Sequence, residues 1–292
     1  MVGGEKMTEK EKFNIPEIMV TTLASYIKNG DVMFQGAATP MPMVAIELAR
    51  ATHAKDITYF SGLGLNPNIP INFEDFMVRG ITEVIKEIKF TNYMYAREMW
   101  DQWQKGRLSL EFLRPAQIDK NWNCNNTVIY GENQNYNKPK IRLPGGMAVS
   151  DALNLMKKVV LYTPRHMKRT FVDEVDFVMA RGYPNSEWRK KYRMGSGPIA
   201  MVTNLCVFEP DLKTGLMAIK SIHPGVTIQQ ILENTGFEPI QPKIIPTTPS
   251  PTLEQIKLIR KKIDPIGFRE IEFPDMRNKV MARVAQKVRG ED

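Results

Sequence analysis

Two glycine turns in this sequence hold residues suited to binding an oxyanion or a phosphate. Phe60 precedes Ser61 and Gly62 at the end of an apolar run, and Gly145 and Gly146 stand just before a predicted helix. Backbone N–H groups at such turns can point together at one negatively charged oxygen. The chemistry these turns could supply is polarisation of a carbonyl group or binding of a phosphate.

A loop rich in asparagine follows a predicted strand over residues 108–113. Gln117 and Asn123 in this loop could orient a carboxylate or a carbonyl group. Asparagine-rich loops also use their side chains to stabilise turns, and each glycine turn is equally explained as a tight strand-to-helix connection. Both interpretations stay open on the residues alone.

The spacing of apolar and turn-forming residues predicts an α/β protein. Helices alternate with strands as in an open, mostly parallel sheet with helices on both faces. Such sheets bind ligands at the carboxyl ends of their strands, where the glycine turns and the loop could meet. We expect helices over 17–27, 42–51, 148–156, 227–234 and 252–262, a helix-rich segment over 73–98, and strands over 31–35, 57–60, 108–113, 128–130, 159–162, 171–179, 198–208 and 216–223.

The chain is expected to form one domain with short appendages. Residues 1–14 are polar and predict a disordered N-terminal extension, and residues 15–273 form the domain. Five prolines within residues 239–251 predict an extended connector. Residues 274–292 predict a charged, frayed helical tail.

Charge and hydropathy favour a cytoplasmic chain that contacts neither nucleic acid nor membrane. The formal net charge of +8 is dispersed over runs such as 189–191 and 260–262, which favours a solvated basic face. No segment has the roughly 20 consecutive apolar residues of a membrane span. The polar N-terminus also lacks the apolar core of a secretory signal.

Cysteine and histidine show no metal-binding spacing. Cys124 and Cys206 lie far apart, and with three scattered histidines they predict two buried thiols and no metal site. His166 stands among basic residues, so we expect it at the surface. His223 precedes Pro-Gly in a turn, so we expect a structural role.

Several segments, taken together and in order, resemble the beta subunit of family I CoA-transferases, most of all the glutaconate CoA-transferase type. The resemblance spans residues 17–273 and implies the fold of that beta subunit. It also implies an alpha-subunit partner, in a heterodimer or heterotetramer, and coenzyme A as part of the substrate with no separately bound cofactor. The segments are 116–119 with Asn123 and Asn125, 138–142, 145–146, 168–176, 202–208, 223–227, 233–237 and 258–265.

The sequence departs from this family at its reactive position. In the transferases a glutamate before Ser-Gly forms a glutamyl-CoA thioester, whereas this chain has Phe60, which has no nucleophilic atom. Trp122 replaces a family glycine, so the resemblance implies a reshaped pocket. Its wall would contain Phe60, Leu63 and Trp122, and its substrate or oxyanion contacts would be Ser61, Gly62, Gln117, Asn123, Gly145 and Gly146.

Two kinds of relative in this superfamily lack the glutamate: a steroid-ring-opening hydrolase and a decarboxylase, both acting on CoA thioesters. Residues 102–107 and 269–271 resemble the hydrolase's beta subunit, and the decarboxylase has a cysteine where this chain has Phe60. We expect ring-opening C–C hydrolysis of an acyl-CoA in a degradation pathway, with the base on the alpha subunit. A CoA-transferase that uses another carboxylate, and a catalytically silent scaffold or regulatory subunit, remain alternatives.

Overall fold

The computed structural model describes residues 13–36, 39–61, 64–67, 73–80, 83–84, 86, 91–92, 95–146, 148–183 and 186–290. The helices are α2 (Ile15–Ser25), α3 (Pro40–Ala51), α4 (Phe73–Arg79), α6 (Ala96–Gln104), α7 (Val149–Leu155), α8 (Ser186–Lys191), α9 (Ile228–Asn234), α10 (Leu253–Leu258), the π-helical turn η1 (Ile259–Ile263), the 3-10 turn η2 (Phe268–Glu270) and α11 (Pro274–Arg289). The strands are β1 (Val32–Gln35), β2 (Thr58–Ser61), β3 (Gly64–Pro67), β4 (Leu110–Leu113), β5 (Gln117–Ile118), β6 (Cys124–Asn125), β7 (Val128–Ile129), β8 (Ile141–Arg142), β9 (Lys158–Thr163), β10 (Pro198–Thr203), β11 (Cys206–Pro210) and β12 (Met217–Ile222).

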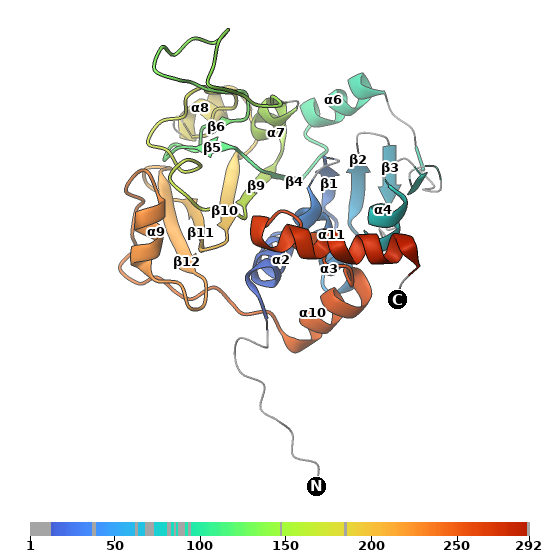
Figure 1. Ribbon diagram of the computed structural model, residues 1–292. Coiled ribbons are helices and arrows are strands. Elements are labelled where there is room, and N and C mark those ends of the chain that lie inside the picture. Colours follow the sequence, from blue (N-terminus) through green and yellow to red (C-terminus); the bar gives the residue numbers. More distant parts are fainter. Residues whose placement is uncertain are drawn as a thin grey trace.

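Eight strands form one sheet in the order β12-β11-β10-β9-β4-β1-β2-β3 (Figure 1). The central strands β10, β9, β4, β1 and β2 run parallel to one another. Strands β3, β11 and β12 pair antiparallel with their neighbours at the two ends of the sheet. The predicted open, mostly parallel sheet is therefore confirmed.

Apolar side chains fill a layer on each face of this sheet. The first core contains buried residues of α2, α3 and α11, such as Leu23, Ile46 and Val280. The second core contains buried residues of α6, α7 and α9, among them Trp103 and Ile231. Helices cover both faces, as predicted, because the apolar stripe of each helix must be buried against the sheet.

The C-terminal segment contributes to the first core. Helix α11 lies across the molecule and packs beside α4 (Figure 1). Val280 and Val284 are both buried, four residues apart on one face of the helix. The charged residues of α11 occupy its other positions, so the helix is amphipathic and packs against the domain.

Residues 171–179 do not form the predicted strand. The segment runs as a loop, and only Phe171 makes an isolated bridge, to Ile118. The prediction was wrong because Phe171 and Val175 are buried without pairing in the eight-stranded sheet, and the ring of Phe171 packs against His166 and Phe208.

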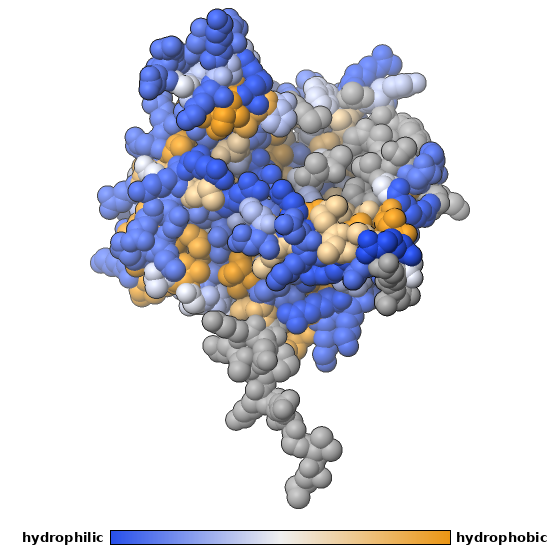
Figure 2. Space-filling model, in the orientation of Figure 1, coloured by the Kyte–Doolittle hydropathy of each residue, from blue (hydrophilic) through white to orange (hydrophobic). Residues whose placement is uncertain are grey.

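The visible surface is mainly hydrophilic, with small apolar patches (Figure 2). The segment between β7 and β8 projects from the body of the domain (Figure 1). Within the ranges given above, no helix is both long and apolar enough to cross a membrane.

Candidate active site

Phe60, which the resemblance places at the position of the transferase glutamate, lies near the carboxyl end of β2. Phe60 pairs with Phe34 of β1, and its side chain is buried in the second core. Ser61, the last residue of β2, pairs with Gly64 of β3, so the chain turns into a hairpin and not into a helix. No helix N-terminus therefore supports this turn. Gly62 and Leu63 lie outside the described residues.

The predicted amide contacts Gln117 and Asn123 are engaged within the loop. Asn123 Nδ2 donates to Asp119 Oδ2 at 2.9 Å, and Asn123 Oδ1 accepts the N–H of Gly182 at 3.1 Å. Gln117 is buried, and its Oε1 accepts from Asn125 Nδ2 at 2.7 Å. Burial raises the pKa of Asp119, although the hydrogen bonds from Asn123 favour its charged form. These amides therefore stabilise the loop itself.

Trp122 is fully buried at the turn of this loop. Its backbone is left-handed, with φ of 66°, and its backbone N–H donates to the carbonyl oxygen of Asp119 at 2.9 Å. Its ring packs edge-on against Tyr183, with 6.5 Å between the ring centroids. The side chain predicted as a pocket wall is thus part of the second core of this chain.

The second glycine turn lies against the same loop. The N–H of Gly145 donates to Asn126 O at 2.8 Å, and Asn126 Oδ1 accepts the N–H of Ala116 at 2.6 Å. Gly145 has φ of +96°, and a Cβ on Gly146 would lie 2.3 Å from Met179 Sδ, so both positions favour glycine. The amide of Gly145 is already used. Of the two predicted glycines, only Gly146 could offer an uncommitted amide to an oxyanion.

The structure thus brings the amide loop and the second glycine turn together at the carboxyl end of β4. Phe60 lies at the same edge of the sheet, but β1 separates β2 from β4. Neighbouring strands are about 4.8 Å apart, so Phe60 and the loop after β4 are separated by roughly 10 Å across the sheet. They can line one ligand site but cannot hold one oxygen atom between them.

The sequence analysis did not predict a group of charged side chains at this edge of the sheet. Glu272 is buried and accepts from Arg114 Nη1 at 2.5 Å, from Tyr162 OH at 3.0 Å and from the N–H of Met41 at 3.1 Å. Burial lowers the pKa of Arg165, and the nearby guanidinium groups of Arg114, Arg277 and Arg169 lower it further. These residues come from segments after β4 and β9 and from the region of α11, so only the fold brings them together.

His166 is buried, contrary to the prediction of a surface position. It is 4% exposed, and its ring nitrogens lie 3.0 Å from the hydroxyl oxygens of Thr203 and Thr235. His223 is also buried, and its Nε2 donates to Thr203 O at 2.7 Å. The two rings therefore join β10 to neighbouring loops, and neither reaches the carboxyl ends of β1 and β2.

Lowering the pH from 7 toward 4 is expected to destabilise the fold through these histidines. Burial lowers the pKa of His166 to about 3 and that of His223 to about 4. The unfolded chain takes up both protons near pH 6.5, so stability is full above that pH and falls by up to ~1.4 kcal/mol per pH unit for each histidine. Thermal melts between pH 7 and 4 measure this slope. A His223→Gln variant should show a shallower slope, and an unchanged slope would contradict the assignment.

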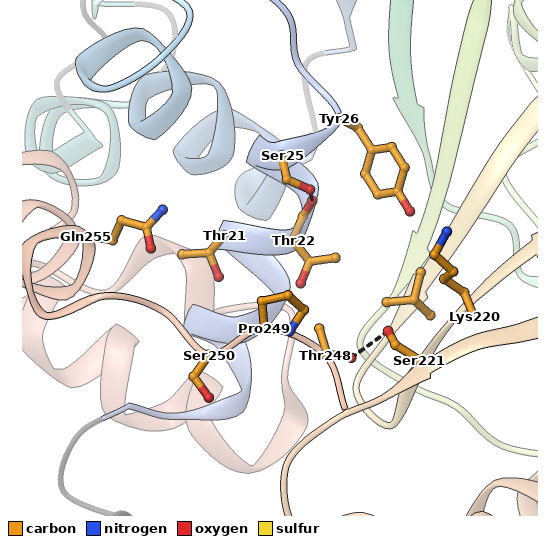
Figure 3. Close-up of a pocket in the computed structure, with 11 residues that line it drawn as sticks. Thr21, Thr22, Ser25, Tyr26, Lys220, Ser221, Thr248, Pro249, Ser250 and Gln255 are labelled. Atoms are coloured by element: carbon orange, nitrogen blue, oxygen red, sulfur yellow. Dashed lines mark hydrogen bonds between the residues drawn. The ribbon is translucent and has the colours of Figure 1, made fainter. Parts of the chain in front are cut away.

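A cavity of mixed polar and apolar lining lies away from this edge of the sheet. It has a volume of about 280 Å³ and lies between α2, β12 and the extended connector, where Val207, Lys220 and Pro249 line it together with several hydroxyl-bearing side chains (Figure 3). Strands β1, β4, β9 and β10 separate β11 and this cavity from β2. Among the described residues, no group of three or more His, Cys, Asp or Glu could hold a metal ion.

The fold and this edge define a subunit of the CoA-transferase type. The family model described as coenzyme A transferase matches residues 17–234. The chain therefore belongs to the coenzyme A transferase family. It is 32% identical over 255 residues to the beta-type subunit of 3-oxoadipate CoA-transferase from Pseudomonas knackmussii, covering 85% of this chain and 92% of that protein.

Two further relatives carry out other reactions. The cholesterol ring-cleaving hydrolase IpdB subunit of Rhodococcus jostii is 28% identical over 243 residues, or 83% of this chain and 89% of that protein. The solved IpdAB complex of that organism aligns with a TM-score of 0.74 and 25% identity, over 91% of this chain and 99% of that one. The decarboxylase AibA/AibB aligns with a TM-score of 0.73 and 26% identity, over 88% and 97% of the two chains.

Both solved relatives are complexes of two kinds of subunit. This chain corresponds to the beta-type subunit, so its partner is an alpha-type subunit, as the sequence predicted. The family assignment is also as predicted. The relatives include a transferase, a hydrolase and a decarboxylase, so similarity alone does not choose among these reactions.

Proposed function

We propose that this chain, together with an alpha-type subunit, cleaves a ring C–C bond of an acyl-CoA by hydrolysis. The observation that carries the proposal is Phe60, a buried aromatic residue where the transferases have their acyl-accepting glutamate. Without a carboxylate there, the covalent route of the transferases cannot start on this residue. Similarity to a ring-cleaving hydrolase supports water as the second reactant.

In this proposal the chain supplies the wall of the acyl pocket and part of the oxyanion site. The ring of Phe60 would favour an apolar, alicyclic acyl group over a second free acid. Backbone amides near Ser61 would polarise one carbonyl group and the amide of Gly146 another, because the two turns are too far apart to share one oxygen atom; each contribution is typically worth about 3 kcal/mol. Gln117 and Asn123 would act by holding the loop, because their polar groups already have partners. The catalytic base would come from the alpha-type subunit.

CoA transfer between carboxylic acids is the second candidate. The 32% identity to the 3-oxoadipate CoA-transferase chain favours it. Transfer would require a carboxylate other than one at position 60, or direct attack by the acceptor acid.

Reaction of the two-subunit complex with a cyclic β-keto acyl-CoA in ¹⁸O-water distinguishes these functions. We expect one solvent oxygen in a newly formed carboxylate, with the CoA thioester retained. Movement of CoA to an added free acid, with no ring opening, would contradict the proposal. Each subunit assayed alone serves as the control.

A further inference from the structure

Glu111 lies in the same transverse row of the sheet as Phe60. It is the second residue of β4 and pairs with Val159 of β9. The parallel register between β1 and β4 sets Phe34 beside Glu111, and Phe34 in turn pairs with Phe60. Glu111 is therefore two strands from the position of the missing glutamate, roughly 10 Å away between Cα atoms.

Glu111 and Phe60 also face the same side of the sheet. Residues that pair in parallel strands point to the same face, and Phe34, Phe60 and Val159 all belong to the second core. The neighbours of Glu111 along β4, Leu110 and Phe112, belong to the first core on the opposite face. The chain that lacks a carboxyl group at position 60 thus has one on the same face, in the same row.

The carboxyl group of Glu111 is buried without a complete set of partners. The residue is 4% exposed, and its Oε2 is buried and makes no hydrogen bond with any of the described residues. Burial raises the pKa of Glu111 well above its usual value, which favours the protonated, uncharged form of the carboxyl group. A buried polar atom without a partner destabilises the fold, so a function that uses this atom would explain why the chain contains it.

A second unpartnered polar atom lies in the same layer. Trp103 is buried, and its Nε1 has no hydrogen-bond partner in the part of the chain that the structure describes. Its ring packs edge-on against Phe34 at 4.8 Å between centroids, and Phe34 is the residue beside Glu111 in the row. A protonated carboxyl group and an indole N–H are both donors. Glu111 and Trp103 thus place two donors without partners beside the ring of Phe34, and these donors fit a ligand that offers acceptor oxygens.

We propose that Glu111 is a catalytic acid of this chain, which protonates the carbon released when the ring bond breaks. This step rests on the proposed function. The acyl group would reach Glu111 along Phe60 and Phe34, from the carboxyl ends of β2 and β1. The thioester oxygen would accept a hydrogen bond from Trp103 Nε1.

Ring opening in this proposal consumes one water molecule. Water adds to the ring ketone and loses one proton to the base of the alpha-type subunit. Collapse of the adduct makes the ketone carbon a carboxyl group, and the electron pair of the broken C–C bond moves onto the carbon beside the thioester. The thioester carbonyl delocalises this pair as an enolate. The carbon then takes the proton of Glu111, and solvent restores that proton.

A neutral buried acid suits this step and does not suit acyl transfer. Transfer needs an ionised carboxylate as nucleophile, whereas enolate protonation needs a carboxylic acid that stays protonated near pH 7. The environment of Glu111 therefore favours C–C cleavage over CoA transfer.

Glu111→Gln in the co-expressed complex tests the proposal, because it replaces a neutral acid by a neutral amide of the same shape. With a cyclic β-keto acyl-CoA, kcat should fall at least ~100-fold while the melting temperature and KM stay close to the wild-type values. Wild-type kcat should decline at alkaline pH as Glu111 ionises, and the variant should lack this decline. Glu111→Asp should restore part of the rate together with the alkaline decline.

Glu111→Leu provides a second variant that fills the core without an acid. It should fold at least as stably as wild type and be as slow as Glu111→Gln. If the wild-type complex opens the ring and Glu111→Gln opens it within threefold as fast, this proposal is wrong and the proposed function stands. If the wild-type complex transfers CoA without ring opening, the proposed function fails, and this step fails with it.

Discussion

Glu17→Ala is expected to lower the free energy of unfolding by about 3–5 kcal/mol. Glu17 is fully buried, and its carboxylate accepts from Arg260 Nε at 2.7 Å, Arg260 Nη2 at 2.8 Å and Arg269 Nη2 at 3.3 Å. Arg269 also donates to Asp264 Oδ2 at 2.8 Å. The variant would leave Arg260 without its ion-pair partner and remove one of the three carboxylates around the buried Arg269, and breaking a buried ion pair from one side is the costly case. It would also remove the hydrogen bond from the N–H of Asn14 that caps α2.

Thermal or denaturant unfolding of the complex and of the isolated chain measures this loss. Glu187→Ala is the matched control, because the side chain of Glu187 is 79% exposed and pairs with the similarly exposed Lys190. That variant should unfold like the wild type. A Glu17→Ala protein as stable as the Glu187→Ala control would show that the buried network does not stabilise the fold.

The architecture could be predicted because it depends on local patterns. Short apolar runs that alternate with amphipathic helices are typical of an α/β protein, in which helices cover a mostly parallel sheet. The single strand predicted over 198–208 is instead two strands, β10 and β11, which pair antiparallel with each other. The apolar residues Phe171 and Val175, with acidic residues between them, are also typical of a strand, and only contacts with distant segments decide against one. For example, the N–H of Gly236 donates to Phe171 O at 2.8 Å.

Charged side chains were the least predictable part of the core. Residues 189–191 were expected on a solvated face, yet Arg189 is buried. Its guanidinium group donates to the backbone carbonyls of Leu153, Gly195, Arg181 and Gly182 at 2.7–3.3 Å. Burial lowers the pKa of Arg189. Five donors on one planar group can satisfy carbonyls from separate loops, which no local pattern of the sequence reveals.

The sequence predicted which segments form the candidate site but not the contacts between them. The turns at Phe60 and Gly145 and the loop around Gln117 do lie at one edge of the sheet. Their hydrogen bonds could not be predicted, because Asn126 joins the loop to the glycine turn through tertiary contacts. Glu111 was overlooked for a similar reason. Its place beside Phe34 depends on the strand order β4-β1-β2, which differs from the order along the chain.

We expect that no covalent acyl or CoA intermediate forms on this chain. A glutamyl-CoA thioester requires an ionised carboxylate that can attack the acyl-CoA. Phe60 offers none, and burial raises the pKa of Glu111 in the same row, which disfavours its ionised form. The complex should therefore turn over acyl-CoA while this chain keeps its unmodified mass at every stage. A transferase beta subunit would instead be modified during turnover.

The most direct test is the intact mass of this chain after the active complex is mixed with acyl-CoA and then treated with borohydride. Borohydride reduces a glutamyl thioester to an alcohol and so leaves a permanent mass change. A transferase beta subunit with its glutamate, treated in parallel, is the positive control. We predict an unchanged mass for this chain while product accumulates. A reduced glutamyl residue on this chain would contradict the account and establish the transferase mechanism.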